Sequence, residues 1–104
     1  MPARAGPVPG RRSGVLLKKY KLELTRQAET VLRRIADRES ALYRRIANVL
    51  DSLEVDPFQG KALKGTLKGF HSYPVGSYRV IYRIFQSSLL VIVIDVGHRR
   101  DIYR

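Results

Sequence analysis

Apolar residues repeat along the first half of the chain with the periods of one strand and two helices. Partial alternation predicts a strand from Leu17 to Leu24. Thr25 can cap the helix that follows, because apolar residues recur three and four positions apart after it. That stripe consists of Ala28, Val31, Leu32 and Ile35. After a break at residues 37–40, a second stripe predicts another helix, which ends before Pro57 because proline disfavours helical geometry in the preceding residue. Its members are Leu42, Ile46, Val49, Leu50 and Leu53.

The second half of the chain carries the shorter repeats and the turn residues of β-strands. Strands are predicted at Phe70 to Val75, Tyr78 to Phe85 and Leu89 to Val96, with the last as the central strand. A tight turn at Gly76-Ser77 joins the first two, and Pro74 indicates an edge position or a bulge. Along the middle strand the alternating faces are Tyr78, Val80, Tyr82 and Ile84 on one side, and Arg79, Ile81, Arg83 and Phe85 on the other.

These elements follow the order β-α-α-β-β-β, which predicts the α+β class with a small antiparallel sheet packed against an N-terminal helical hairpin. The length of 104 residues fits one domain. We expect residues 16–104 to form it, and residues 1–15, which hold three of the five prolines, to be a flexible lead-in. No apolar run approaches the roughly 18–20 residues that span a bilayer, and none resembles a signal core. We therefore expect a cytoplasmic protein without membrane contact.

Positive charge is concentrated in the second half of the chain. The whole sequence has 20 Lys+Arg against 9 Asp+Glu, a formal net charge of +11. Residues 21–56 are balanced, whereas residues 57–94 contain no acid at all. Basic residues accumulate there at Lys61, Lys64, Lys68, Arg79 and Arg83. Such an uneven distribution indicates a polyanionic partner or an acidic protein partner.

The inventory of reactive side chains is narrow. The chain has no cysteine, and its two histidines, His71 and His98, lack metal-ligand spacing, so we expect neither a metal site nor a cofactor. No phosphate-cradling loop or dinucleotide fingerprint is present. Arginine, lysine, histidine and tyrosine remain, and they suit RNA cleavage, because the ribose 2′-hydroxyl supplies the nucleophile while the protein neutralises the phosphate and moves protons.

Three segments in order and spacing resemble the RelE/ParE toxin superfamily: LKG at residues 63–65, VGSYRVIYRI at 75–84 and VGHRRDIYR at 96–104. The resemblance covers residues 17–104 and implies a toxin held inactive by an acidic, RelB-like antitoxin, with which it could form a heterotetramer. RelE-like members of the superfamily cut messenger RNA in the ribosomal A site, whereas ParE-like members poison DNA gyrase.

Some of these positions match functional residues of the family. The resemblance implies that Arg79 contacts the scissile phosphate, that Arg99 stabilises the transition state or protonates the leaving group, and that Tyr103 stacks on or orients the base. Lys64 matches a basic residue that binds RNA. His71 and Tyr73 stand where ribosome-dependent members place two lysines, and we expect them to be the proton carriers.

The remaining expected RNA contacts are electrostatic, at Lys61, Lys68, Arg83 and Arg100. Several of these positions also have plain structural interpretations: Arg79 could pair with a helix carboxylate, and Arg99 and Arg100 could lie in a solvated turn. Tyr103 could seal the end of the sheet. We expect a metal-independent, ribosome-dependent endoribonuclease toxin, with a gyrase inhibitor or a non-toxic antitoxin-binding relative as alternatives.

Overall fold

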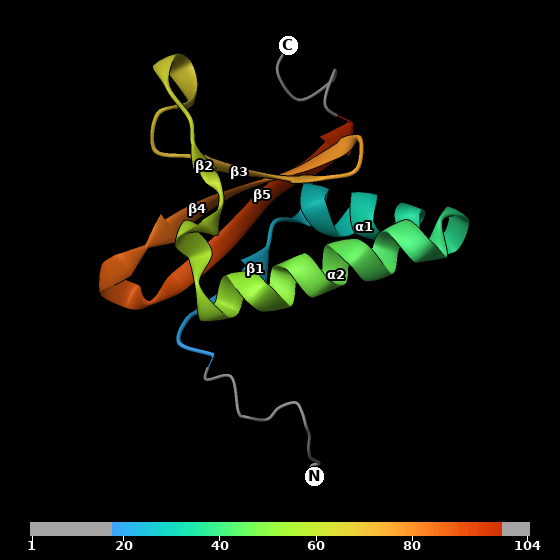
Figure 1. Cartoon of the computed structure of the whole chain (residues 1–104), viewed down its shortest axis with the longest axis horizontal. Coiled ribbons are helices and arrows are strands. Elements are labelled where there is room, and N and C mark those ends of the chain that lie inside the picture. The colour runs from blue at the N-terminus through green and yellow to red at the C-terminus, as the bar shows by residue number, and fades with distance from the viewer. Residues whose placement is uncertain (1–17, 99–104) are drawn as a thin grey trace, which may run out of the picture.

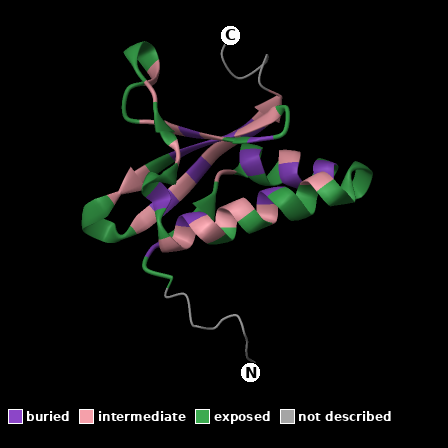
Figure 2. Ribbon diagram, viewed as in Figure 1, coloured by how far each residue is buried: buried purple, intermediate pink, exposed green. Residues whose placement is uncertain are grey.

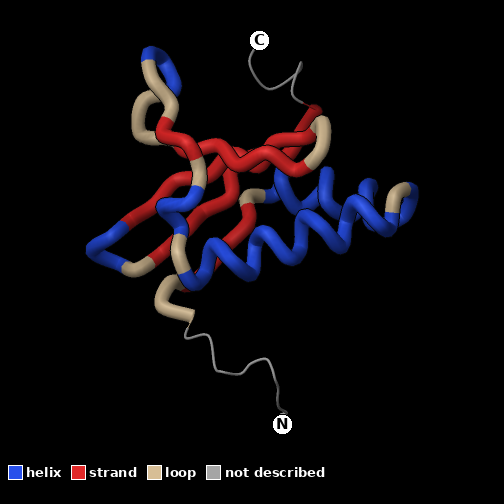
Figure 3. Tube along the Cα trace, viewed as in Figure 1, coloured by secondary structure: helices blue, strands red, loops and turns tan. Residues whose placement is uncertain are grey.

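Two antiparallel helices lie side by side on one face of a five-stranded sheet in the computed structural model, which describes residues 18–98 (Figure 1). The strands are β1 (Lys21–Leu24), β2 (Lys61–Ala62), β3 (His71–Val75), β4 (Tyr78–Phe85) and β5 (Leu90–His98), and the helices are α1 (Arg26–Arg38) and α2 (Ser40–Val55). Short 3-10 helices η2 (Pro57–Gln59), η3 (Gly65–Leu67) and η4 (Gln86–Ser88) connect some of them (Figure 3). The predicted α+β class and helical hairpin are confirmed. Between residues 18 and 98, no helix is long and apolar enough to cross a bilayer.

The sheet differs from the predicted one in two ways. Its strand order is β1-β5-β4-β3-β2, and β1 pairs with β5 in parallel, so the sheet is mixed rather than purely antiparallel. Alternation along a strand does not show whether its partner runs parallel or antiparallel to it, and β1 and β5 are far apart in sequence. The two-residue strand β2, which pairs with the start of β3, is too short to leave a periodic signal. The middle strand is therefore β4, with β5 beside it, and Pro74 lies where β3 extends beyond its short neighbour β2.

Thr25 ties the start of α1 to the sheet. Its hydroxyl accepts a hydrogen bond from the Ala28 N–H (3.1 Å) and donates one to the Ile94 carbonyl (2.7 Å). The Thr25 N–H also donates to the Val93 carbonyl at 3.0 Å. Ile94 is the extra residue of a β-bulge, since Tyr82 pairs with Val93 while the preceding residue of β4 pairs with Asp95. The predicted cap residue thus fixes the helix and the bulge together.

The core lies between the helices and the sheet, as the buried residues in Figure 2 show. Both predicted helical stripes face it, and so does the predicted apolar face of β4. The fully or nearly fully buried contributors are Ala28, Leu32 and Ile35 of α1, Ile46 and Leu53 of α2, and Val80, Tyr82, Val91, Val93 and Val96 of the sheet. Because this packing removes apolar surface from water, one face of the sheet stays covered by the helices.

Tyr82 organises the end of this core. The side chain is fully buried, and its hydroxyl donates to the Pro57 carbonyl (2.7 Å) and accepts from the Gly60 N–H (3.1 Å). Burial, with smaller contributions from neighbouring groups, raises the pKa of Tyr82 to about 12. A Cβ at Gly60 would collide with this hydroxyl and come within 2.8 Å of the Ser72 carbonyl, so the close approach of the η2–β2 segment requires glycine.

His71 packs against Tyr82. The two rings stack with centroids 5.5 Å apart, and Phe58 contacts the other side of the imidazole edge-on at 6.4 Å. Burial lowers the pKa of His71 below its ordinary value of 6.5, and its Nδ1 is buried without a hydrogen-bond partner. The imidazole is therefore held neutral at neutral pH and behaves as an aromatic packing element.

Removing the Tyr82 hydroxyl should destabilise the fold. In Tyr82→Phe the buried Pro57 carbonyl and Gly60 N–H lose their partner, and we expect the free energy of unfolding to fall by about 1–3 kcal/mol. Tyr43→Phe is the matched control, because Tyr43 is 38% exposed and its change should stay within about 0.5 kcal/mol. Urea denaturation measures both variants, and equal effects would contradict the assigned role.

His71 should make stability depend on pH. Because its folded-state pKa is lowered, the unfolded chain binds the proton more tightly, so this contribution is complete above the ordinary value of 6.5 and is lost as pH falls through the lowered pKa. His71→Phe keeps an aromatic ring on Tyr82 but cannot titrate. As the pH falls from 7.5 into the acidic range, the native chain should therefore lose more stability than the variant. A stability difference that stays constant across denaturation curves in that range would refute this expectation.

Candidate nucleic-acid interface

The register of the hairpin divides its side chains between the two faces of the sheet. Directly paired residues share a face, and successive residues alternate. The face that packs on the helices contains Val80 and Tyr82. No described helix of the α1–α2 pair covers the opposite side, which we call the helix-free face (Figures 1 and 3). By this pairing it is formed by Ser72 and Pro74 of β3, Arg79, Ile81, Arg83 and Phe85 of β4, and Leu90, Ile92, Asp95 and Gly97 of β5.

Arg79 occupies a favourable position for binding an anion on this face. It pairs with Pro74 on one side and Gly97 on the other, so neither neighbour has a polar side chain that competes for the guanidinium. Its Nε is buried without a hydrogen-bond partner, and among residues 18–98 no carboxylate forms an ion pair with it. The structural interpretation of Arg79 as the partner of a helix carboxylate therefore does not hold within the described residues. The Arg79 side chain as a whole is half-buried, and the part of its guanidinium that stays exposed can donate to an external anion.

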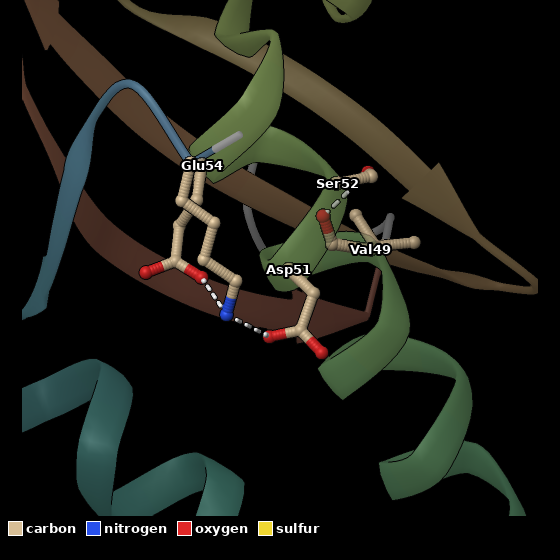
Figure 4. A network of polar contacts seen from close by, with 5 residues as sticks. Val49, Asp51, Ser52 and Glu54 are labelled. Atoms are coloured by element: carbon tan, nitrogen blue, oxygen red, sulfur yellow. Dashed lines mark hydrogen bonds and ion pairs between the residues drawn. The ribbon is translucent and has the colours of Figure 1, made fainter. Parts of the chain in front are cut away.

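Acidic side chains of α2 are engaged elsewhere. Asp51 and Glu54 lie 3.9 Å and 3.2 Å from the Lys18 ammonium, away from the helix-free face (Figure 4). The same figure shows the Ser52 hydroxyl donating to the Val49 carbonyl at 2.7 Å. On β5, Asp95 accepts a hydrogen bond from the N–H of the next residue at 2.8 Å. Among residues 18–98, therefore, no ion pair joins a carboxylate to a basic residue of the helix-free face.

Arg83 lies on the same face between two phenylalanine rings. Its guanidinium carbon is 5.2 Å from the centroid of Phe70 and 5.4 Å from that of Phe85. The arginine is exposed, whereas both rings are half-buried. Strand alternation correctly placed Phe85 on the same face as Arg79 and Arg83, but it assigned no role to that ring. Phe70 precedes another strand, so no pattern along β4 connects it with Arg83.

The segment between β2 and β3 projects from the side of the sheet opposite α1 and α2 (Figure 3). It contains the exposed residues Lys64 and Lys68, and Lys61 is exposed just before it in β2. A Cβ at Gly69 would lie 3.6 Å from an Arg83 nitrogen, so the segment reaches the helix-free face; its φ of +96° suits glycine. The predicted basic residues Lys61, Lys64, Lys68, Arg79 and Arg83 thus line or flank one region.

His71 and Tyr73 are placed on the other face. The two-residue turn pairs Tyr73 with Val80 and His71 with Tyr82, so both side chains point toward the helices while Arg79 points away from them. The structure therefore does not bring the two expected proton carriers together with the expected phosphate ligand. Counting outward from the turn gives this result, because each pair in such a hairpin shares a face.

A separate hollow of about 290 Å³ lies where β5 passes α1. Its lining includes Arg34, Tyr78, Asp95 and His98, and the Tyr78 and His98 rings meet edge-on at 5.8 Å. Sequence reasoning did not connect Arg34 or Asp95 with this region, because only the packing of α1 on β5 brings them together. Within residues 18–98, no three histidine, cysteine, aspartate or glutamate side chains cluster as metal ligands.

Arg99, Arg100 and Tyr103 lie outside the described residues. The structure does fix the end of β5, where Gly97 pairs with Arg79 and His98 with Tyr78. Arg99 is therefore two positions along the chain from the residue opposite Arg79.

One relative and two solved structures show what this chain is similar to. The Toxin RelG of Mycobacterium tuberculosis is 44% identical over 45 residues, which span 43% of this chain and 52% of the relative's length. The RelBE2 toxin–antitoxin complex of Mycobacterium tuberculosis contains a chain of similar structure, with a TM-score of 0.70, 26% identity, and coverage of 80% of this chain and 94% of that one. The archaeal RelE–RelB complex of Pyrococcus horikoshii OT3 gives 0.64 and 26%, with coverage of 78% and 96%.

The family match extends over most of the chain. Residues 22–103 fit the family described as the ParE toxin of type II toxin–antitoxin system, parDE. That span includes both helices, the whole β3–β5 sheet and the segment that carries Lys64. The chain therefore belongs to the ParE toxin family of type II toxin–antitoxin systems, within the RelE/ParE superfamily.

Proposed function

We propose that this toxin is a RelE-like, ribosome-dependent endoribonuclease that cleaves messenger RNA in the A site. The observation that carries the proposal is Arg79, a half-buried arginine without a carboxylate partner among the described residues, on a cationic sheet face. Arginine binds phosphate through two parallel hydrogen bonds and stays charged, which makes it suited to a scissile phosphodiester.

The nucleophile of the proposed reaction is the RNA's own 2′-hydroxyl. It attacks the adjacent phosphorus and the bond to the 5′-oxygen of the next nucleotide breaks, while solvent water takes the proton of the 2′-hydroxyl and supplies one to the departing 5′-oxygen. Arg79 neutralises the charge that develops on the non-bridging oxygens. We assign the second cation to Arg99 and base positioning to Tyr103, by resemblance. His71 and Tyr73 are on the helix side, so we assign them to packing rather than to proton transfer.

Dependence on the ribosome is supported by a second set of cations. The helices, which pack on the sheet face opposite Arg79, carry exposed arginines that form no ion pair among the described residues: Arg26, Arg38 and Arg44. A substrate strand needs only one face of so small a domain. Cations on both faces suit a protein that is embedded in a larger RNA while it acts on a single strand.

A gyrase inhibitor is the second candidate, because the matching family is that of ParE. In this case the basic face would bind a protein or DNA surface, and Arg79 would contribute affinity without catalysis.

We also propose an acidic antitoxin as the protein partner. Two structurally similar chains come from toxin–antitoxin complexes, and the net charge of +11 favours an acidic segment. Binding across the helix-free face would occupy Arg79 and silence the toxin.

Expression in growing cells, with mapping of transcript 5′ ends, tests the nuclease. The native chain should cut within translated codons. Arg79→Ala should reduce cutting by at least about 100-fold, because it removes a transition-state donor. Arg79→Lys should be intermediate to poor, since it keeps the charge but loses the fork. Arg33→Ala is the matched control: it removes an exposed arginine of α1 that already pairs with Glu29 at 3.5 Å, outside the second set of cations, and it should cut normally. Intact transcripts with DNA-damage signalling and inhibited gyrase supercoiling would support the second candidate instead.

The antitoxin is tested by co-expression with the acidic protein encoded beside this gene. We expect one complex on size exclusion, and we expect the bound toxin to leave transcripts uncut. Separate elution of the two proteins at physiological salt would contradict this part of the proposal.

A further inference from the structure

We propose that Phe70, Arg83 and Phe85 form a stacking subsite for an unpaired nucleobase of the strand whose phosphate Arg79 binds. This inference rests on the proposed function, because it names a second contact with the same single-stranded RNA. We call the three residues the stacking cluster.

The geometry of the cluster resembles a base-binding platform more than a charge patch. The guanidinium carbon lies 5.2 Å and 5.4 Å from the two ring centroids, within the range of cation–π contacts. Arg83 is exposed, so part of its planar group remains accessible to a ligand. Aromatic rings and arginine planes are the surfaces on which single-stranded nucleic acids stack, whatever the base.

The backbone positions the cluster independently of any ligand. The Phe70 N–H donates to the Leu67 carbonyl at 3.0 Å, and the Phe70 carbonyl accepts from the Leu63 N–H at 2.9 Å. Arg83 and Phe85 are fixed by the pairing of β4 with β5. A platform held in this way loses little conformational entropy when a base stacks on it.

The distance from Arg79 sets which nucleotide the cluster would reach. Arg79 and Arg83 are four residues apart on one face of β4, which corresponds to about 13 Å along the strand. The two guanidiniums would therefore contact different nucleotides of one extended strand. Stacking needs a free base face, so the proposed ligand is unpaired rather than duplex RNA.

An acidic protein segment is the competing ligand for these cations. The charge of Arg83 would attract such a segment, but its carboxylates would not stack on the two rings beside the guanidinium. Lys64 and Lys68 offer exposed charge nearby, and within residues 18–98 the cation–π contacts are those of Arg83. The observations therefore favour a nucleobase at the stacking cluster, and an acidic segment becomes an outcome of the test.

A binding experiment with the full chain and an uncleavable oligonucleotide tests this inference. The probe is a short single-stranded RNA with a 2′-deoxy residue at the scissile position. The intact probe has all its bases. A second series of probes carries one abasic residue each, at successive positions along the strand. Phe70→Trp supplies a reporter, because the sequence contains no tryptophan. Its fluorescence should be quenched when the intact probe binds. One abasic position should abolish the quenching.

Arg83→Lys separates stacking from charge. It should weaken binding of the intact probe by about 5- to 100-fold, as expected for one lost base stack, and should weaken the probe that is abasic at the critical position much less. Arg79→Ala is the matched comparison: it should weaken both probes by the same factor, because it acts on phosphate. Thermal melting confirms that each variant is folded.

The results are distinguishable from those of the cleavage test. Equal losses for both probes in Arg83→Lys, or unquenched Phe70→Trp with bound probe, would overturn the stacking subsite. So would an Arg83→Lys defect confined to antitoxin binding. Selective loss on the intact probe would support the subsite even if transcripts stay uncut. Cutting that depends on Arg79 without selectivity at Arg83 would leave the proposed function standing and remove only this inference.

Discussion

The two-residue turn at Gly76-Ser77 decides which side chains of this toxin face the core and which face outward. Gly76 has φ of +61°, typical of the first position of a type II′ turn, and the turn pairs Val75 with Tyr78. Every later pair along β3 and β4 follows from that first one. A register shift of one residue would bury Arg79 and Arg83 and expose Tyr82. The turn therefore controls both the core and the basic face.

Burial of the side chains on one face strongly favours this register of β3 and β4. Tyr82 is fully buried with two hydrogen bonds, and the valines of β5 share the same face. Thr25 and the bulge at Ile94 hold α1 against that face. With one side of the sheet committed to the helices, cations from β4 have only the other side available. The basic surface is thus a consequence of the same packing that stabilises the fold.

The family membership concerns the class of protein, whereas the basic face concerns its molecular target. The match with ParE toxins establishes the class of protein. It does not assign the target, because the superfamily contains both nucleases and gyrase inhibitors. The roles proposed for Arg79 and the stacking cluster bear on the target directly, since a phosphate ligand and a stacking surface on one face would suit a single RNA strand.

The sequence by itself determined the two helices, the β3–β5 strands, the turn and the concentration of positive charge, because these depend on local periodicity and composition. Only the tertiary structure decided the parallel pairing of β1 with β5 and the small strand β2, whereas the separation of His71 and Tyr73 from Arg79 follows from the local register of the turn. The tertiary structure also brought Phe70 to Arg83 from the segment that precedes β3. Residues distant in sequence share a face or a partner only through long-range pairing, and no local pattern encodes the direction or the neighbour of a strand.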